Sequence, residues 1–208
     1  MIGQTCNYLY LMMFKKAALF LSLLFIGTVT HAQTADQVYD QYLDFNKARL
    51  EGQTSKAMSI GESILANVGK LPAKSRTTYY SGLAKLYEDN SQPEKAITYN
   101  EMVAAAEPDY YVTHRALGYL YNERASAVYD KMRATKDAAV LAALTAEYKT
   151  KVLKALPHLE KAQACDPSDE TLTLIKFLYN SIKDKQGLGT LNSRLTGLGK
   201  NCLSILSE

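Results

Sequence analysis

The chain has 208 residues, 47% of them apolar and 22% charged, which is the composition of an ordinary soluble protein. Its 24 basic and 21 acidic side chains nearly balance. We therefore expect no nucleic-acid partner, because nucleic-acid binding needs a clustered basic surface. The length is sufficient for one domain with a sizeable core or for a short repeat array.

The N-terminal segment has the pattern of a secretory signal peptide. Lys15 and Lys16 precede thirteen uncharged residues, Ala17 to Val29, and a small-residue exit site ends at Ala32. This order predicts a signal peptide over residues 1–32 with cleavage before Gln33. The alternative is a membrane anchor, but thirteen residues extend only ~20 Å as a helix, against a hydrocarbon core of ~30 Å.

Several expectations follow from this segment. The true start is Met1 or one of two later methionines, Met12 and Met13. Loss of the two lysines in the segment leaves 22 of the 24 basic side chains beside 21 acidic ones. We expect an exported protein, periplasmic or extracellular, without a stable membrane anchor after cleavage.

From Thr34 onward the apolar residues recur with a helical period, and no stretch alternates like a β-strand over more than a few residues. Turn-forming residues divide this region into eight expected helices in four antiparallel pairs. The expected breaks lie at residues 51–52, 67–72, 90–93, 108–109, 135–137, 166–168 and 184–189.

Two segments repeat a pattern of large and small residues at a distance of 34 residues. The first has Tyr80, Leu83, Ala84 and Tyr87, followed by Ala96 and Pro108; the second has His114, Leu117, Gly118 and Tyr121. The pattern resembles the tetratricopeptide repeat, in which small residues let two antiparallel helices approach closely. Asn100 departs from it at a position where the family has an aromatic residue, and Tyr99 is expected to take over some of that packing.

The third pair contains an insertion. Ala96 to Pro108 and Ala155 to Pro167 both span twelve residues, but Tyr87 to Ala96 spans nine where Tyr121 to Ala155 spans thirty-four. Twenty-five residues are therefore inserted at the tip of the third hairpin. We expect residues 33–208 to form an all-α superhelix of about four TPR-like helical hairpins, with the third hairpin elongated and projecting.

The resemblance implies a concave groove lined by the first helices of successive pairs, which holds a peptide or a partner segment. A merely solvated face is the alternative. Only Asn46 matches the family's pattern for holding a C-terminal carboxylate, so we expect no ligand of that type. The expected groove residues are Tyr42, Asn46, Arg49, Lys85, Arg115, Tyr119, Asn122 and Phe177.

No catalytic site is expected. His158 and Cys165 are seven residues apart, which separates them by ~10.5 Å along one helix, whereas a nucleophile and its base need ~3 Å. His114 falls on an inward position of its repeat, where a packed histidine is the ordinary interpretation. We expect no metal and no cofactor. Cys165 and Cys202 either form a disulfide or remain two buried free thiols, and we favour the thiols.

The C-terminal region carries leucines at helical spacing, which predicts a capping helix over residues 188–206. A dimer seam along the same stripe is the alternative, so the expected state is a monomer or a weak homodimer. The sequence as a whole predicts an exported, non-enzymatic interaction module that binds a peptide or protein through the groove, the projecting hairpin or both. The alternative function is a self-assembling component of the cell envelope.

Overall fold

A computed structural model of the chain describes residues 33–206, and the predicted signal peptide lies outside the described residues. Within residues 33–206 the structure is all-helical, as expected, and no helix there is long and apolar enough to cross a bilayer. The helices are α2 (Ala35–Leu50), α3 (Thr54–Ile64), the 3-10 helix η1 (Leu65–Lys70), α4 (Ala73–Asp89), α5 (Pro93–Ala106), α6 (Tyr111–Ala134), α7 (Ala138–Cys165), α8 (Asp169–Ser181), α9 (Lys185–Gly189) and α10 (Leu191–Leu198).

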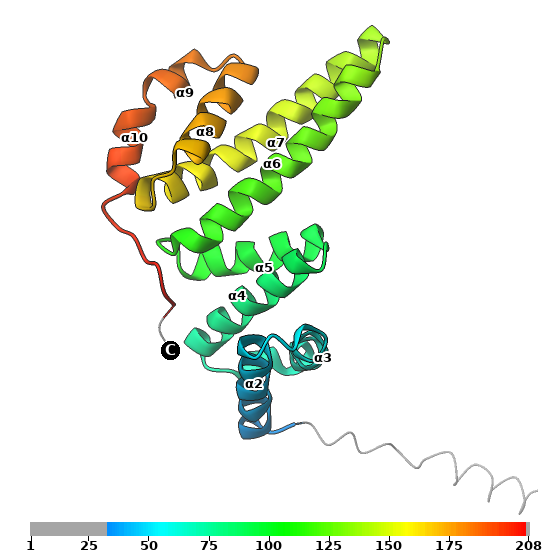
Figure 1. Cartoon of the computed structure of the whole chain (residues 1–208), viewed down its shortest axis with the longest axis vertical. Coiled ribbons are helices and arrows are strands. Elements are labelled where there is room, and N and C mark those ends of the chain that lie inside the picture. Colours follow the sequence, from blue (N-terminus) through cyan, green and yellow to red (C-terminus); the bar gives the residue numbers. More distant parts are fainter. Residues whose placement is uncertain (1–32, 207–208) are drawn as a thin grey trace, which may run out of the picture. The chain divides into compact units, whose positions relative to one another are not determined.

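Successive helices pack as hairpins, α2 on α3, α4 on α5 and α6 on α7, and each hairpin contacts the next (Figure 1). The expected breaks are confirmed at the turns that follow α2, α4, α5, α6 and α7, whereas η1 occupies much of the break expected at 67–72 and α9 (Lys185–Gly189) occupies the one expected at 184–189. The fourth unit is different, because α8 is followed by two short helices, α9 and α10. The expected single helix over residues 188–206 is therefore wrong: it is interrupted at Thr190 and ends at Leu198 before Gly199.

Polar side chains fix where several helices begin. Thr34 accepts a hydrogen bond from the backbone of Gln37 and the Gln37 side chain returns one, which forms a capping box at the start of α2. Asp137 accepts from two backbone N–H groups at the start of α7, and Ser168 accepts from Thr171 at the start of α8. These caps satisfy amide groups that the first turn of a helix leaves without partners.

The core lies between the paired helices, and its small residues allow the close approach that the repeat pattern predicts. Ala84, Ala96 and Ala155 are all 0% exposed. A Cβ atom built on Gly118 would lie 2.7 Å from the side chain of Leu159, which is itself fully buried. Because an ordinary side chain would collide there, the spacing of α6 and α7 depends on glycine at this position.

Tyrosine rings fill much of the second hairpin. Tyr99 stacks on Tyr87 and on Tyr80, with ring centroids 5.6 Å apart in both pairs. The hydroxyl of fully buried Tyr79 donates to the Gly61 carbonyl at 2.6 Å and so joins α4 to α3. The expectation that Tyr99 contributes the packing missing at Asn100 is confirmed; Asn100 itself is buried and accepts from Thr113.

The third hairpin is the longest, as the insertion predicts. Helix α6 has 24 residues and α7 has 28, whereas α4 has 17 and α5 has 14. The extra fourteen residues of α7 over α5 amount to roughly 20 Å of helix. The distal parts of α6 and α7 extend past α8 in Figure 1 and contact mainly each other. Helix α7 runs through Pro157 without interruption.

Candidate functional site: a groove along the first helices

An open depression of about 290 Å³ is lined mainly by the first helices of three successive hairpins, with Asn100 of α5 and Tyr110 of the α5–α6 turn completing it. Arg49 comes from α2, Lys85 and Glu88 come from α4, and Val112 and Ala116 come from α6. The predicted groove residues Arg49 and Lys85 are thus brought together although they are separated by 36 positions. The depression combines two cations, one carboxylate and an apolar wall.

Arg49 is held in position by its neighbours. Its guanidinium donates to the Asn46 amide oxygen at 3.0 Å and lies 5.4 Å from the centre of the Phe45 ring. Buried Gly82 leaves the space that the guanidinium occupies, since a Cβ there would lie 2.5 Å from Arg49 Nη1. Burial lowers the pKa of Arg49 while nearby Tyr42 raises it. A partly desolvated, pre-positioned guanidinium binds an anionic group more strongly than a free surface arginine does.

Tyr42 does not line the groove, so that prediction is wrong. The side chain is 0% exposed and belongs to the core. Its position explains the burial, because Val38, Tyr42 and Phe45 are spaced four and three residues apart and form the apolar stripe that α2 turns inward. Asn46 is half-buried, and it contributes to the groove by accepting the hydrogen bond that positions Arg49.

Arg115 and Tyr119 are engaged in holding α6 to the next unit. Arg115 forms an ion pair with Asp166 at 2.5 Å, and the Tyr119 hydroxyl lies 2.9 Å from Thr171 Oγ1. Asp166 and Thr171 belong to the α7–α8 turn and the start of α8. Neither side chain reaches the depression that Arg49 lines, and neither does half-buried Asn122. A single continuous groove through all the predicted residues is therefore not present.

Phe177 lies on a different surface. It is 55% exposed on α8 and lines a separate hollow against the projecting hairpin. Apart from Tyr42 in the core and half-buried Asn122, the predicted residues thus divide into a group around Arg49, the pair Arg115 and Tyr119 that joins α6 to the next unit, and Phe177 at the elongated third hairpin.

The two cysteines are joined, which corrects the preference for free thiols. The Cα atoms of Cys165 and Cys202 lie 5.5 Å apart and a disulfide connects them. Their environment also differs from the expectation, because Cys202 is exposed and Cys165 is only half-buried. The disulfide attaches the C-terminal segment to the end of α7.

The same segment is attached at two further points. Lys161, only 6% exposed, donates to the Leu198 and Asn201 carbonyls and pairs with Asp109 at 2.8 Å. Leu203 then exchanges backbone hydrogen bonds with the turn between α5 and α6, donating to Asp109 and accepting from Tyr111. We call residues 199–206 the C-terminal strap.

The leucine stripe of the C-terminal region faces inward. Leu191 is 2% exposed, and Leu188 and Leu195 pack partly buried against the core. Arg194 secures α10 by donating to the buried Glu160 carboxylate at 2.8 and 2.7 Å. The leucines of the stripe are consequently occupied within the chain, whereas Ile205 beyond them is 75% exposed.

His158 has a partner that the sequence analysis missed. It lies on the same helix as Cys165, but its Nδ1 atom is 2.9 Å from Nδ1 of His114 on α6. The only sequence signal for this contact is that the two histidines occupy matching positions in two helices that are expected to face each other. Among residues 33–206 no group of three or more His, Cys, Asp or Glu side chains is arranged to hold a metal ion.

Comparisons with known proteins give no relative: no protein-family model, no curated protein and no solved structure matches the chain. The resemblance to the tetratricopeptide repeat therefore rests on the residues of this sequence.

Proposed function

We propose that the chain is an exported, non-enzymatic interaction module that binds a segment of a peptide or protein in the groove along α2, α4 and α6. The observation that carries the proposal is the convergence of Arg49, Lys85 and Glu88 with the exposed wall at Val112 in one open depression. The resemblance to tetratricopeptide repeats supports it, because in those proteins the first helices of the hairpins line the binding surface.

The chemistry of the groove fits a polypeptide better than a small molecule. Val112 is 39% exposed and offers an apolar contact, while the ends of Lys85 and Glu88 remain in solvent. Lys85 pairs with Asp89 at 2.5 Å, but both side chains are exposed, so a ligand carboxylate can displace this pair at little cost. Cation, carboxylate and apolar wall together match the backbone and mixed side chains of an extended segment.

Export is the second part of the proposal. It rests on the signal-peptide pattern of residues 1–32 and on the Cys165–Cys202 disulfide, since disulfides persist in the periplasm and outside the cell and are rare in the cytosol. A fusion of residues 1–32 to a periplasmic reporter tests this part directly. Reporter activity that stays in the cytosol would contradict it.

The groove is tested by selecting short random peptides on the chain from residue 33 onward and measuring their affinity for variants. Lys85→Glu reverses a charge and Val112→Trp fills the depression; both positions are exposed. We expect each to weaken the selected peptides by about tenfold. Lys56→Glu on α3, exposed and outside the groove, is the matched control and should have no effect. If every selected peptide bound both groove variants like the unmodified chain, the groove would be disproved.

A further inference from the structure

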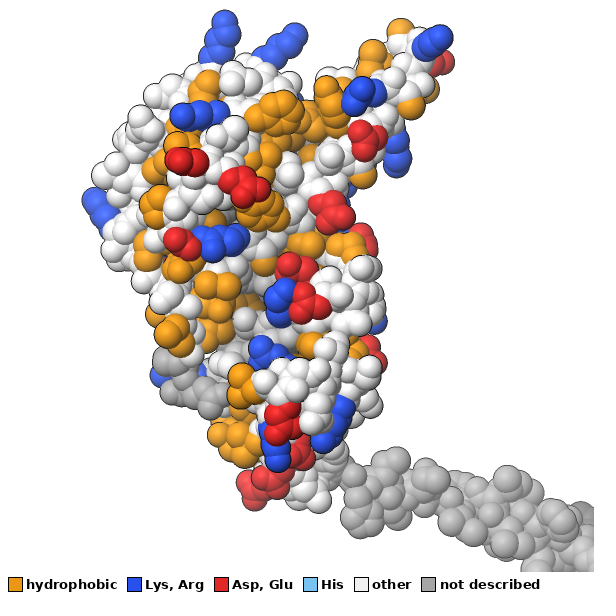
Figure 2. Space-filling view, viewed as in Figure 1, with side chains coloured by type: hydrophobic (Ala, Val, Ile, Leu, Met, Phe, Trp, Pro, Cys, Tyr) orange, Lys and Arg blue, Asp and Glu red, His pale blue; other side chains and the backbone are white. Residues whose placement is uncertain are grey.

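A second hollow, of about 410 Å³, lies where the projecting hairpin passes the end of α8. Figure 2 shows hydrophobic side chains gathered over this angle between α8 and the distal parts of α6 and α7. Its residues come from three helices: Tyr129 from α6, Tyr148 and Lys149 from α7, and Phe177 with Ser181 and Lys183 from α8 and the turn after it.

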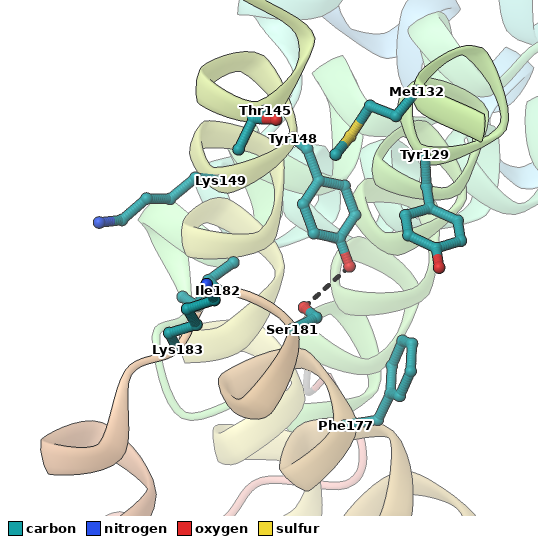
Figure 3. A pocket seen from close by; sticks show the side chains of 9 residues that line it. All are labelled: Tyr129, Met132, Thr145, Tyr148, Lys149, Phe177, Ser181, Ile182 and Lys183. Carbon is teal, nitrogen blue, oxygen red and sulfur yellow. Dashed lines mark hydrogen bonds between the residues drawn. The ribbon is translucent and has the colours of Figure 1, made fainter. Parts of the chain in front are cut away.

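The hollow has a fixed floor and an open aromatic wall. Tyr148, which is 5% exposed, forms the floor of the hollow. Its hydroxyl donates to Ser181 Oγ at 2.9 Å, and this hydrogen bond holds the ring in place. Tyr129 and Phe177 form the wall, and they are 40% and 55% exposed (Figure 3). Large aromatic side chains this exposed around one hollow are the usual composition of the centre of a protein interface.

The insertion explains why this surface has no neighbour in the chain. Helix α8 ends at Ser181, whereas α6 and α7 continue outward past it. Tyr129 and Tyr148 contact each other with ring centroids 5.7 Å apart, so the hairpin is held together without covering the hollow. The apolar residues of the distal hairpin therefore exceed what joining its two helices requires.

The charges at the rim all have one sign. Lys149 and Lys183 lie on the side of the hollow opposite Tyr129 and Phe177 in Figure 3, and no carboxylate is among the lining residues. Within residues 33–206 neither lysine takes part in an ion pair. Two unpaired ammonium groups beside an aromatic wall attract a ligand that carries carboxylates next to an apolar group.

We infer that this hollow is a docking site for a segment of a partner protein that presents a large aromatic or aliphatic side chain beside acidic residues. The apolar side chain enters between Tyr129 and Phe177 over the Tyr148 floor, and its acidic neighbours meet Lys149 and Lys183. The inference rests on the proposed function only in taking the chain to be a binding module; the site is separate from the groove at Arg49.

The test uses dye-labelled peptides in which a phenylalanine is flanked by aspartates, with fluorescence anisotropy on the chain from residue 33 onward. Two matched probes replace the phenylalanine by alanine or the aspartates by lysines. We expect binding of the first probe only, with an affinity that falls as salt is raised. Phe177→Ser should weaken it by about tenfold and Lys149→Glu by about fivefold.

The controls separate this site from the groove and from self-association. Leu153→Ser removes a side chain that is 48% exposed on α7 outside the hollow, and it should leave the affinity unchanged. Binding that is lost in Lys85→Glu but kept in Phe177→Ser overturns this inference and leaves the proposed function standing. Equal binding of all three probes, or of none, also overturns it, as does a homodimer in sedimentation that Phe177→Ser converts to a monomer. Peptides selected at the groove report on the proposed function independently of these outcomes.

Discussion

The Nδ1 atoms of His114 and His158 lie 2.9 Å apart across the α6–α7 interface. His114 Nε2 lies 3.0 Å from the Pro108 carbonyl, which only accepts, so Nε2 carries a proton. In the neutral pair His158 Nδ1 therefore donates to His114 Nδ1. If both histidines were protonated, their two Nδ1–H groups would point at each other, so the pair takes up at most one extra proton.

The histidine pair predicts a loss of stability in mild acid. Burial, reinforced by His114, lowers the pKa of His158 to about 4, and burial also lowers the pKa of His114. Nearby Glu101 raises the pKa of His158, Lys161 lowers that of His114, and Asp109 raises it. The unfolded chain takes up protons near pH 6.5, so the free energy of unfolding should fall by about 2 kcal/mol between pH 6.5 and 4.

Urea unfolding at several pH values measures this effect. His158→Gln keeps a side-chain donor for His114 but does not titrate, so its stability should change less over the same range. Because the carboxylates contribute equally to both proteins, the difference between the two curves isolates the histidine. Parallel curves would contradict the assignment.

Removal of the disulfide should destabilise the chain. Cys165 and Cys202 are 37 positions apart, and closing a loop of that length contributes about 4 kcal/mol in the chain-entropy model. We expect Cys202→Ser, or addition of a reductant, to lower the free energy of unfolding by about that amount. The Cys165→Ser, Cys202→Ser double variant is the control, because its unfolding midpoint should not respond to reductant. An unchanged midpoint for the reduced original chain would contradict the prediction.

Two glycines should respond in opposite directions to the same substitution. Gly118→Ala places a Cβ 2.7 Å from the Leu159 side chain and 3.0 Å from its backbone nitrogen, and we expect a loss of about 2 kcal/mol. Gly197→Ala in α10 meets nothing within 4 Å and should gain about 0.5 kcal/mol through helix propensity. The urea unfolding midpoints of the two variants measure these changes in stability. Equal effects would show that α6 and α7 are not in close contact at Gly118.

The Arg194–Glu160 contact should be essential for attaching α10. Glu160 is 3% exposed and accepts from Tyr179 and Arg194. Arg194→Met leaves a buried carboxylate without its cation, and we expect a cost of about 3 kcal/mol. Adding Glu160→Leu should restore part of the stability, because the unpaired charge is then gone. Additive losses in this double-mutant cycle would mean that the two side chains are not coupled.

Much of the fold could be predicted because its determinants are local. Helix boundaries follow from residues such as Asp137 and Pro93, whose capping or conformational preferences act within one turn. The close approach of α6 and α7 follows from the position of Gly118 in the repeat pattern. The length of the third hairpin follows from counting residues between matching positions.

The site could be predicted only in part, because its remaining determinants are distant in sequence. Arg115 finds Asp166 across 51 positions, and nothing local to Arg115 identifies that partner. The inward face of α2 could not be predicted correctly, because the repeat pattern begins only at Tyr80, and Tyr42 therefore lies in the core instead of the groove. Lys161 resembles a surface lysine in sequence, but its partners Asp109, Leu198 and Asn201 are 37 to 52 positions away.

The C-terminal strap has a consequence for how the chain unfolds. In a stack of hairpins each unit contacts only its neighbours, so the terminal units normally fray first. Here Leu203 bonds to the backbone at Asp109, in the turn before the third hairpin, and Cys202 is bonded to Cys165. The last unit cannot open without releasing the turn between α5 and α6. We expect the amide hydrogens of α8 to exchange with solvent as slowly as those of α6, so that the carboxyl-terminal end unfolds together with the centre.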